Sequence, residues 1–236
     1  MHVQKCGGIS IHEAIRRSYG LRARIAGRSL FSIDAPVSAS AASFLGVGTY
    51  AHRRHLLVYH LGLPRARYVS GHVPCPPDVV ERFSDRWRFV TMLRHPVDRW
   101  FSHYFFDRYK KDDHRRTDLD LEDYASSPEG LRQGSAFVQF LTGRDPDDAT
   151  SVDAIETALD NLARFAVVGL LEDVSRFERE FEAELGVRLR IPRRNASPLP
   201  AHRRRGLVTG GMRRRVEEIC APDLRLHAAW LRRRGL

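Results

Sequence analysis

The feature that most constrains the fold lies at the start of the chain, where a short apolar segment runs into a lysine and two glycines. Residues 2–10 read His-Val-Gln-Lys-Cys-Gly-Gly-Ile-Ser. The apolar start predicts a strand, the glycines a tight turn and the following residues the first turn of a helix. A strand that passes through such a turn into a helix is typical of α/β proteins with a parallel sheet. Exposed backbone N–H groups and the helix dipole also make the turn a candidate phosphate site.

The order of residues in this turn differs from the common loop that binds nucleoside triphosphates. That loop reads G-x-x-x-x-G-K-[ST], with the lysine after the glycines. Here Lys5 precedes Gly7 and Gly8. The reversed order predicts a different phosphate ligand, which the rest of the chain must identify.

The remainder of the chain alternates short apolar runs with amphipathic segments, a pattern that predicts an α/β domain. Strands are predicted over residues 66–70, 87–93 and 165–170. Helices are predicted over residues 9–19, 50–61, 77–83, 96–109, 152–164 and 174–185, with one or two more in 121–142 and two in 211–234. Residues 27–48, 110–120 and 188–205 are predicted to be loops, and the first and last of these are candidates for ligand contact because long loops are often functional.

We therefore predict one domain over residues 1–236, in which a central parallel sheet is flanked by helices. Its core is expected in residues 1–185, followed by a basic loop and C-terminal helices in residues 186–236. A chain of 236 residues is long enough to bury a sizeable core as a single domain.

The composition is strongly basic, with a formal net charge of +10. Lysine occurs only at positions 5, 110 and 111, so nearly all of the positive charge is arginine. One interpretation is a solvated surface that happens to use arginine. The other is a surface for an anionic partner, since the planar guanidinium can donate two hydrogen bonds to a phosphate or sulfate. The two interpretations are compatible.

The cysteines and the N-terminus predict a cytoplasmic protein. Cys6, Cys75 and Cys220 are odd in number and widely spaced, which argues against a disulfide framework or a zinc site. The chain begins without the basic and apolar pattern of a signal peptide. It also contains no run of about 20 apolar residues, the length that a membrane span needs.

Three segments are predicted to meet at the carboxyl ends of strands, where parallel sheets bind ligands. The first is residues 5–10, the second is Ser70-Gly71-His72, and the third is residues 93–102, which read Leu-Arg-His-Pro-Val-Asp-Arg-Trp-Phe-Ser. Lys5, His72 and Arg94 each follow a predicted strand, so we expect these side chains to converge.

With these segments the chain resembles the sulfotransferases that use 3′-phosphoadenosine 5′-phosphosulfate (PAPS), in particular the branch related to heparan sulfate 2-O-sulfotransferase. Residues 5–10 match the Lys-x-Gly-Gly-x-Ser loop, and residues 93–102 match Leu-Arg-x-Pro-x-x-Arg-x-x-Ser at every fixed position. Weaker matches are Gly71-His72 and Val-Gly-Leu-x-Glu at residues 168–172. Cys6 stands where the family often has threonine, and Ser70 where the 2-O branch has a second histidine.

The resemblance implies a phosphate-loop fold of three layers and a role for each matching residue. The loop of Lys5, Cys6, Gly7, Gly8, Ile9 and Ser10 would bind the 5′-phosphosulfate. Lys5 would stabilise charge on the phosphate leaving group, and no metal ion would be needed. Arg94 and Ser102 would hold the 3′-phosphate, and Arg193 and Asn195 would close over the cosubstrate.

The resemblance also implies the acceptor chemistry. His72 would be the general base that takes the proton from an acceptor hydroxyl. The acceptor would be a glycan or a glycosylated small molecule, with no membrane partner and no nucleic acid. Two alternatives stay open: a kinase-like phosphate-loop enzyme, which would need Mg²⁺ ligands, and a non-enzymatic binder of nucleic acid or another anionic polymer, whose affinity would fall steeply with salt.

Overall fold

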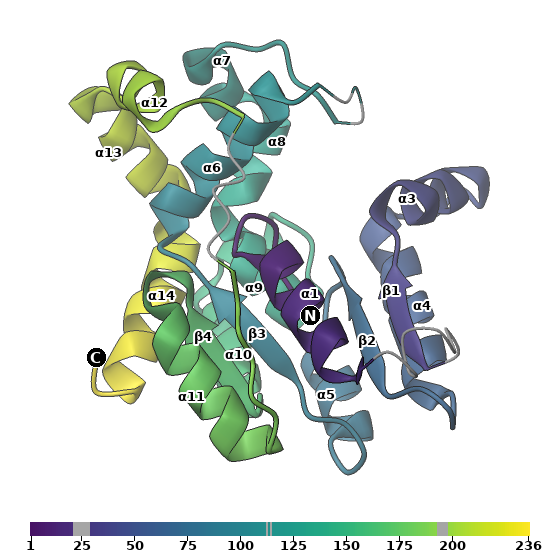
Figure 1. The fold of residues 1–236 in the computed structure, drawn as a ribbon. Coiled ribbons are helices and arrows are strands. Elements are labelled where there is room, and N and C mark those ends of the chain that lie inside the picture. Colours follow the sequence, from purple (N-terminus) through teal and green to yellow (C-terminus); the bar gives the residue numbers. More distant parts are fainter. Residues whose placement is uncertain (21–28, 112, 114, 193–197) are drawn as a thin grey trace.

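The fold is a mixture of helices and short parallel strands (Figure 1). It is seen in a computed structural model that describes residues 1–20, 29–111, 113, 115–192 and 198–236. The strands are β1 (Leu30–Ile33), β2 (Tyr68–Gly71), β3 (Val90–Leu93) and β4 (Val167–Leu170). The first helices are α1 (Gly8–Ser18), α3 (Ala35–Phe44), α4 (Thr49–Gly62), α5 (Pro77–Phe83), α6 (Pro96–Tyr109), α7 (Leu121–Ser126) and α8 (Pro128–Arg132). They are followed by α9 (Ala136–Thr142), α10 (Val152–Ala163), α11 (Val174–Leu185), α12 (Ala201–Leu207), α13 (Gly210–Ile219) and α14 (Ala221–Arg233).

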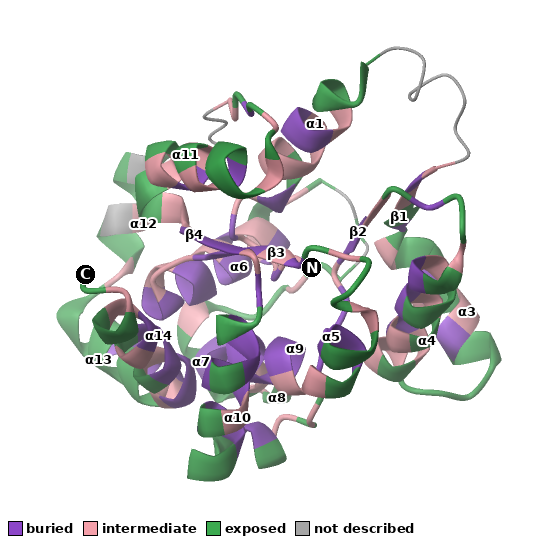
Figure 2. Cartoon of the chain, turned by 90° about the horizontal axis from the view of Figure 1, so that it is seen from below, coloured by how far each residue is buried: buried purple, intermediate pink, exposed green. Residues whose placement is uncertain are grey.

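The strands form two parallel pairs, and the single central sheet predicted from the sequence is absent from the described residues. β1 pairs with β2, with Leu30 opposite Tyr68, and β3 pairs with β4, with Val90 opposite Val167. The first residues of the chain run between the two pairs (Figures 1 and 2). Met1 N donates to Val90 O at 3.3 Å on one side, and His2 N donates to Gly71 O at 3.2 Å on the other. The segment before the Gln4 turn is too short to form a ladder with either neighbour, so the two pairs stay separate.

Helices lie on both sides of the strands (Figure 2). α1 and α11 lie on one side, and α5, α9 and α10 lie on the other. The larger buried cluster fills the space between them and includes Leu93, Phe137, Leu162 and Phe177. A second cluster, around Trp100 of α6, packs against α7 and α13. None of the described helices is long and apolar enough to cross a membrane.

Most elements lie where the sequence predicts them, but two predictions are wrong. The strand predicted before Lys5 does not form, because residues 1–3 are too few to pair along either neighbouring strand. The prediction for residues 27–48 is wrong as well. α5 and α6 begin and end at the predicted residues, and β3 and β4 are shorter versions of the predicted strands. Residues 27–48, predicted as a loop, contain β1 and α3. The Asp34 side chain begins α3 by accepting a hydrogen bond from Val37 N at 2.8 Å, as an N-cap residue does. Residues 188–205 also include the start of α12, which was not predicted.

Candidate functional site

The turn before α1 has a backbone path that needs its glycines. Gly7 lies in the left-handed region at φ 76°, and Lys5 lies there too at φ 67°. A Cβ atom on Gly7 would come within 2.8 Å of Leu171 Cδ1, and one on Gly8 would meet the His2 ring at 2.2 Å. The turn therefore packs tightly between the segment before it and the end of β4, as only glycine allows.

The N-terminus of α1 presents unpaired backbone donors. The first helical hydrogen bond runs from Ile11 N to Gly7 O at 3.2 Å, so the helical ladder gives no acceptor to the N–H groups of Gly8, Ile9 and Ser10. Gly7 is the N-cap residue and supplies no side-chain cap, and the first turn contains no acidic residue. Ile9 is exposed and Ser10 half-buried, so this end of the helix can be approached from solvent. Such an end attracts anions.

Lys5 adds a partly buried cation to this turn. Its Nζ lies 3.8 Å from the centre of the Phe106 ring, and Asp107 is the negative charge that acts most strongly on it. Burial lowers the pKa of Lys5 to about 8; Asp107 works in the opposite direction, and Arg94 and Lys110 add to the lowering. Lys5 is therefore mostly charged at pH 7 and loses its proton as the pH rises through about 8.

Cys6, by contrast, faces the core. It is fully buried, its Sγ lies 3.7 Å from Gln4 O, and burial raises its pKa to about 12. The thiol stays protonated at neutral pH, so it is not a nucleophile. Only the backbone of Cys6 is placed to take part in anion binding.

Arg94 links the end of β3 to the turn before α1. Its Nη1 donates to Lys5 O at 3.3 Å, and burial lowers the pKa of the guanidinium. The next residue, His95, donates its backbone N–H to Glu172 Oε1 at 2.9 Å, which joins the end of β4 to the start of α6. Sequence analysis assigned no role to Glu172, although it ends the Val-Gly-Leu-x-Glu match. These bonds connect the ends of β3 and β4 to the turn that carries Lys5.

Ser102 lies on α6, four residues beyond Asp98 and therefore on the same helix face. Ser102 is half-buried. Arg213 of α13 reaches this face, where its Nη1 lies 3.5 Å from Asp98 Oδ1. The pairing was missed because nothing in the sequence links α13 to α6.

His72 directly follows β2 and is fixed through its ring. Nδ1 lies 3.1 Å from His2 O, and the two histidine rings meet edge to face at 4.0 Å. Because a carbonyl oxygen can only accept, the proton of the neutral ring lies on Nδ1, and Nε2 carries a free lone pair. Burial lowers the pKa of His72 to about 4, a shift that the hydrogen bond to His2 opposes in part. The imidazole is therefore neutral at physiological pH, the form that a base requires.

Arg53 of α4 fixes the backbone of His72 by a hydrogen bond. Its guanidinium is buried and donates to His72 O at 3.3 Å, to Ala35 O at 2.8 Å and to Ser38 Oγ at 2.8 Å. The last two acceptors belong to α3. One arginine thereby ties α3, α4 and the residue after β2 to each other.

A polar cluster that sequence analysis missed lies beside the turn. Tyr50 OH accepts from Gln4 Nε2 and from Arg132 Nη1, both at 3.3 Å. Arg132 also pairs with Glu129 at 2.6 Å, and His103 Nε2 lies 3.6 Å from Glu129 Oε1. Burial would raise the pKa of Glu129, but the nearby His103 and the hydrogen bonds from Arg132 and Gln133 lower it overall. His103 and Phe106 are three residues apart and therefore lie on the same face of α6. This spacing is the sequence signal from which the α6 contribution to the site could have been predicted.

Of the residues singled out in the sequence, Lys5, His72 and Arg94 are gathered around residues 2–5. Arg193 and Asn195 lie outside the described residues. Within the described part of the chain, no group of three or more His, Cys, Asp or Glu side chains is arranged to hold a metal ion. No protein-family model matches the chain, and no curated protein matches it.

Proposed function

We propose that the protein is a sulfotransferase that transfers a sulfuryl group from PAPS to a hydroxyl acceptor. The observation that carries the proposal is the hydrogen bond from Arg94 Nη1 to Lys5 O. It joins Arg94, which follows β3, to the turn that carries Lys5 and leads into a helix N-terminus with neither a side-chain cap nor an acidic residue in its first turn. A nucleotide with phosphates at two separate positions suits such a site.

The arrangement of the elements supports the same proposal. The strands are parallel, and α1 and α6 begin where the segments before them end, as in sheets that bind ligands at their carboxyl edge. Helices lie on both sides of the strands. We therefore propose the three-layer, phosphate-loop architecture of PAPS-dependent sulfotransferases, in which residues 1–3 occupy the place of a central strand.

The donor half of the site follows from the cations. The N–H groups of Gly8, Ile9 and Ser10, with Lys5, would hold the 5′-phosphosulfate, while Arg94 and Ser102 would hold the 3′-phosphate. PAPS supplies the sulfuryl group and an anionic leaving group. Lys5 acts most strongly when charge builds up on that leaving group, so it lowers the barrier rather than only binding the ground state.

The acceptor half centres on His72. With its proton on Nδ1 and bonded to His2 O, His72 has Nε2 available to accept the proton of a hydroxyl. We propose a carbohydrate hydroxyl as the first acceptor class to test, on the resemblance alone.

Calorimetric titration with the desulfated product, 3′-phosphoadenosine 5′-phosphate, tests the proposal. We expect wild type to bind and Arg94→Ala to lose at least about tenfold in affinity, since one charge-assisted hydrogen bond is worth about 1.5–3 kcal/mol. Arg179→Ala is the matched control, because Arg179 is exposed on α11, and it should bind as wild type does. Absence of binding by wild type would refute the proposed function. Binding of ATP with Mg²⁺ in its place would favour the kinase alternative.

A further inference from the structure

Two of the three lysines in the chain meet at the ring of Phe106. Lys5 Nζ lies 3.8 Å from the ring centre and Lys110 Nζ lies 5.5 Å from it, although the two residues are far apart in the sequence. Lys5, Phe106 and Lys110 are each half-buried, so a ligand can reach both ammonium groups from solvent. A chain whose positive charge is nearly all arginine thus places a pair of lysines beside the proposed donor site.

Asp107 fixes the position of Lys110, the residue that ends α6. Its Oδ1 accepts from Lys110 Nζ at 2.8 Å, and only 11% of the lysine side chain and 9% of the aspartate side chain are exposed. The other carboxylate oxygen lies 3.6 Å from His103 Nε2. An ammonium has three donors, and with the described residues Lys110 makes this one hydrogen bond. Two donors of a well-positioned cation are therefore available to a ligand.

The charges that meet at Phe106 leave a surplus of positive charge. Lys5 and Lys110 bring two ammonium groups, and Asp107 brings one carboxylate. The groups act on one another: burial lowers the pKa of Lys5 most, Asp107 opposes this, and Lys110 adds to the lowering. A surplus cation with free donors suits an anionic group that lies next to the phosphate at the start of α1.

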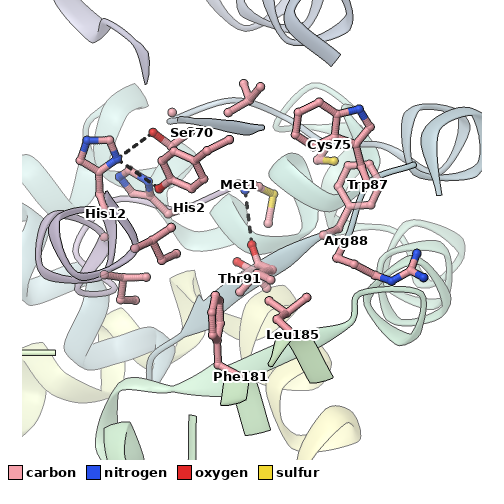
Figure 3. Close-up of a pocket in the computed structure, with 18 of the residues that line it drawn as sticks. Met1, His2, His12, Ser70, Cys75, Trp87, Arg88, Thr91, Phe181 and Leu185 are labelled. Atoms are coloured by element: carbon pink, nitrogen blue, oxygen red, sulfur yellow. Dashed lines mark hydrogen bonds between the residues drawn. The ribbon is translucent and has the colours of Figure 1, made fainter. Parts of the chain in front are cut away.

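The other space beside this turn, a cavity of about 390 Å³ between β2 and β3, does not suit an anion (Figure 3). Gly8 lines part of it, but the lining is largely apolar and includes Phe181. Arg88 lies at its edge with the guanidinium turned outward, where it donates to Ser84 O at 3.0 Å. An anionic group therefore finds its counter-charges at Phe106 rather than in this cavity.

We propose that Lys110 binds the sulfuryl group of PAPS and is a second catalytic cation beside Lys5. This inference rests on the proposed function and names the residue that distinguishes PAPS from its desulfated product. During transfer, the bond between sulfur and the phosphate oxygen breaks and leaves its electron pair on that oxygen, next to Lys5. The acceptor oxygen forms the new bond to sulfur, and its proton passes to His72 Nε2. Lys110 keeps its own protons and holds the sulfuryl oxygens in position between donor and acceptor.

Separate calorimetric titrations with PAPS and with 3′-phosphoadenosine 5′-phosphate, both without acceptor, test this role. We expect Lys110→Ala to keep its affinity for the product within about twofold and to lose at least about tenfold in affinity for PAPS, the effect of one charge-assisted hydrogen bond. Transfer to an acceptor should also fall by about 100-fold. Lys111→Ala is the matched control, because Lys111 is the adjacent lysine and is exposed, and it should leave both affinities unchanged.

Two further variants separate the charge of Lys110 from its packing. Lys110→Met keeps an unbranched side chain against Phe106 without the charge, and it should show the same selective loss of PAPS affinity. Lys110→Arg keeps the charge and should recover part of that affinity. A melting curve for each variant checks that it folds.

Unchanged PAPS affinity in both Lys110→Ala and Lys110→Met would overturn the inference. Equal losses for PAPS and for the product would overturn it too, because Lys110 would then support the site as a whole rather than the sulfuryl group. A loss in Lys111→Ala as large as that in Lys110→Ala would assign the effect to general positive charge and would also contradict it. If wild type binds neither nucleotide, the proposed function fails and this inference with it. If the product still binds to every variant, the proposed function stands whatever the result for Lys110.

Discussion

Lys5 is the residue whose charge depends most directly on its surroundings. Burial lowers its pKa to about 8, so it is positive below that pH and neutral above it. An anionic ligand binds the charged form better, and we expect the affinity for 3′-phosphoadenosine 5′-phosphate to fall as pH rises through about 8. In Lys5→Arg the guanidinium keeps its charge, and the fall should disappear. Calorimetric titrations between pH 6.5 and pH 9.5 measure both.

Lys111→Arg is the control for this pH effect, because Lys111 is exposed in the loop after α6. It should retain the fall that wild type shows. A fall of equal size in Lys5→Arg would mean that another group titrates. Lys5→Ala should also reduce the rate of sulfuryl transfer by about 100- to 1,000-fold, as loss of one preorganised charge does in comparable sites.

His72 has a lowered pKa of about 4, which places its titration far from that of an ordinary histidine. A base must be neutral, so the acid limb of kcat/KM should lie near pH 4, with no inflection near 6.5 caused by this residue. His72→Ala should bind the product as wild type does and lose about 100- to 10,000-fold in transfer of a radiolabelled sulfuryl group from PAPS to oligosaccharide hydroxyls. His55→Ala, at an exposed position on α4, is the control. Full turnover by His72→Ala would remove His72 from the mechanism.

At the scale of elements, one buried ion pair ties α6, α9 and α14 together. Asp223 of α14 accepts hydrogen bonds from Phe137 N at 3.0 Å and Val138 N at 3.2 Å at the start of α9. Arg99 of α6 lies 4.0 Å from the carboxylate and donates to Gln133 Oε1 at 2.9 Å. Burial raises the pKa of Asp223 to about 7, against the opposite effects of Arg99 and the backbone donors.

Removing this carboxylate should be costly because it leaves the Arg99 charge buried without its counter-ion. We expect Asp223→Ala to lower the free energy of unfolding by about 3–5 kcal/mol, measured by urea denaturation. Asp153→Ala is the comparison: Asp153 pairs with Arg144 at the surface, with 78% of its side chain exposed, and its loss should cost under about 1 kcal/mol. Equal costs would show that the buried pair contributes no more than a surface one.

The elements that were predicted well have strong local signals. Pro96 begins α6 and Pro77 begins α5, each at a position where a missing N–H costs nothing. α3 also has a start signal, with Asp34 as N-cap and Pro36 in its first turn, but it buries only Ser38 and Ala42 and exposes Phe44. Without an apolar stripe, a segment rich in Ser and Ala cannot be told from a loop. The pairing of the strands could not be predicted from the sequence either, because it depends on how residues 1–3 contact β2 and β3, which are far away along the chain.

For the whole molecule, ligand binding and stability are linked. A ligand at 100 times its Kd stabilises the folded state by about 2.7 kcal/mol. For a chain of 236 residues, such a gain raises Tm by roughly 5–10 °C. We expect this shift with 3′-phosphoadenosine 5′-phosphate, and a much smaller one with adenosine 5′-phosphate at the same concentration, because it lacks the group that Arg94 and Ser102 would hold. Differential scanning fluorimetry measures both, and equal shifts would contradict a second phosphate subsite.

The candidate site was predictable where short motifs end a strand. His72 follows β2 and Arg94 follows β3, whereas Lys5 follows a segment that forms no strand; the structure gathers all three around the first residues of the chain. The partners that set their state were not predictable. Phe106 and Asp107 near Lys5, His2 against His72 and Arg213 beside α6 belong to contacts between segments far apart in the sequence.

The guanidinium of Arg53 has a consequence for how this architecture can be altered. It donates hydrogen bonds to α3 and to the carbonyl of His72, so we expect α3, α4 and the proposed base to move together. Replacing α3 and α4 by other helices would remove the hydrogen bond that holds the backbone of His72, unless the replacement contained an equivalent arginine. A change in α3 or α4 should therefore also change the orientation of His72, and with it the preference for the acceptor.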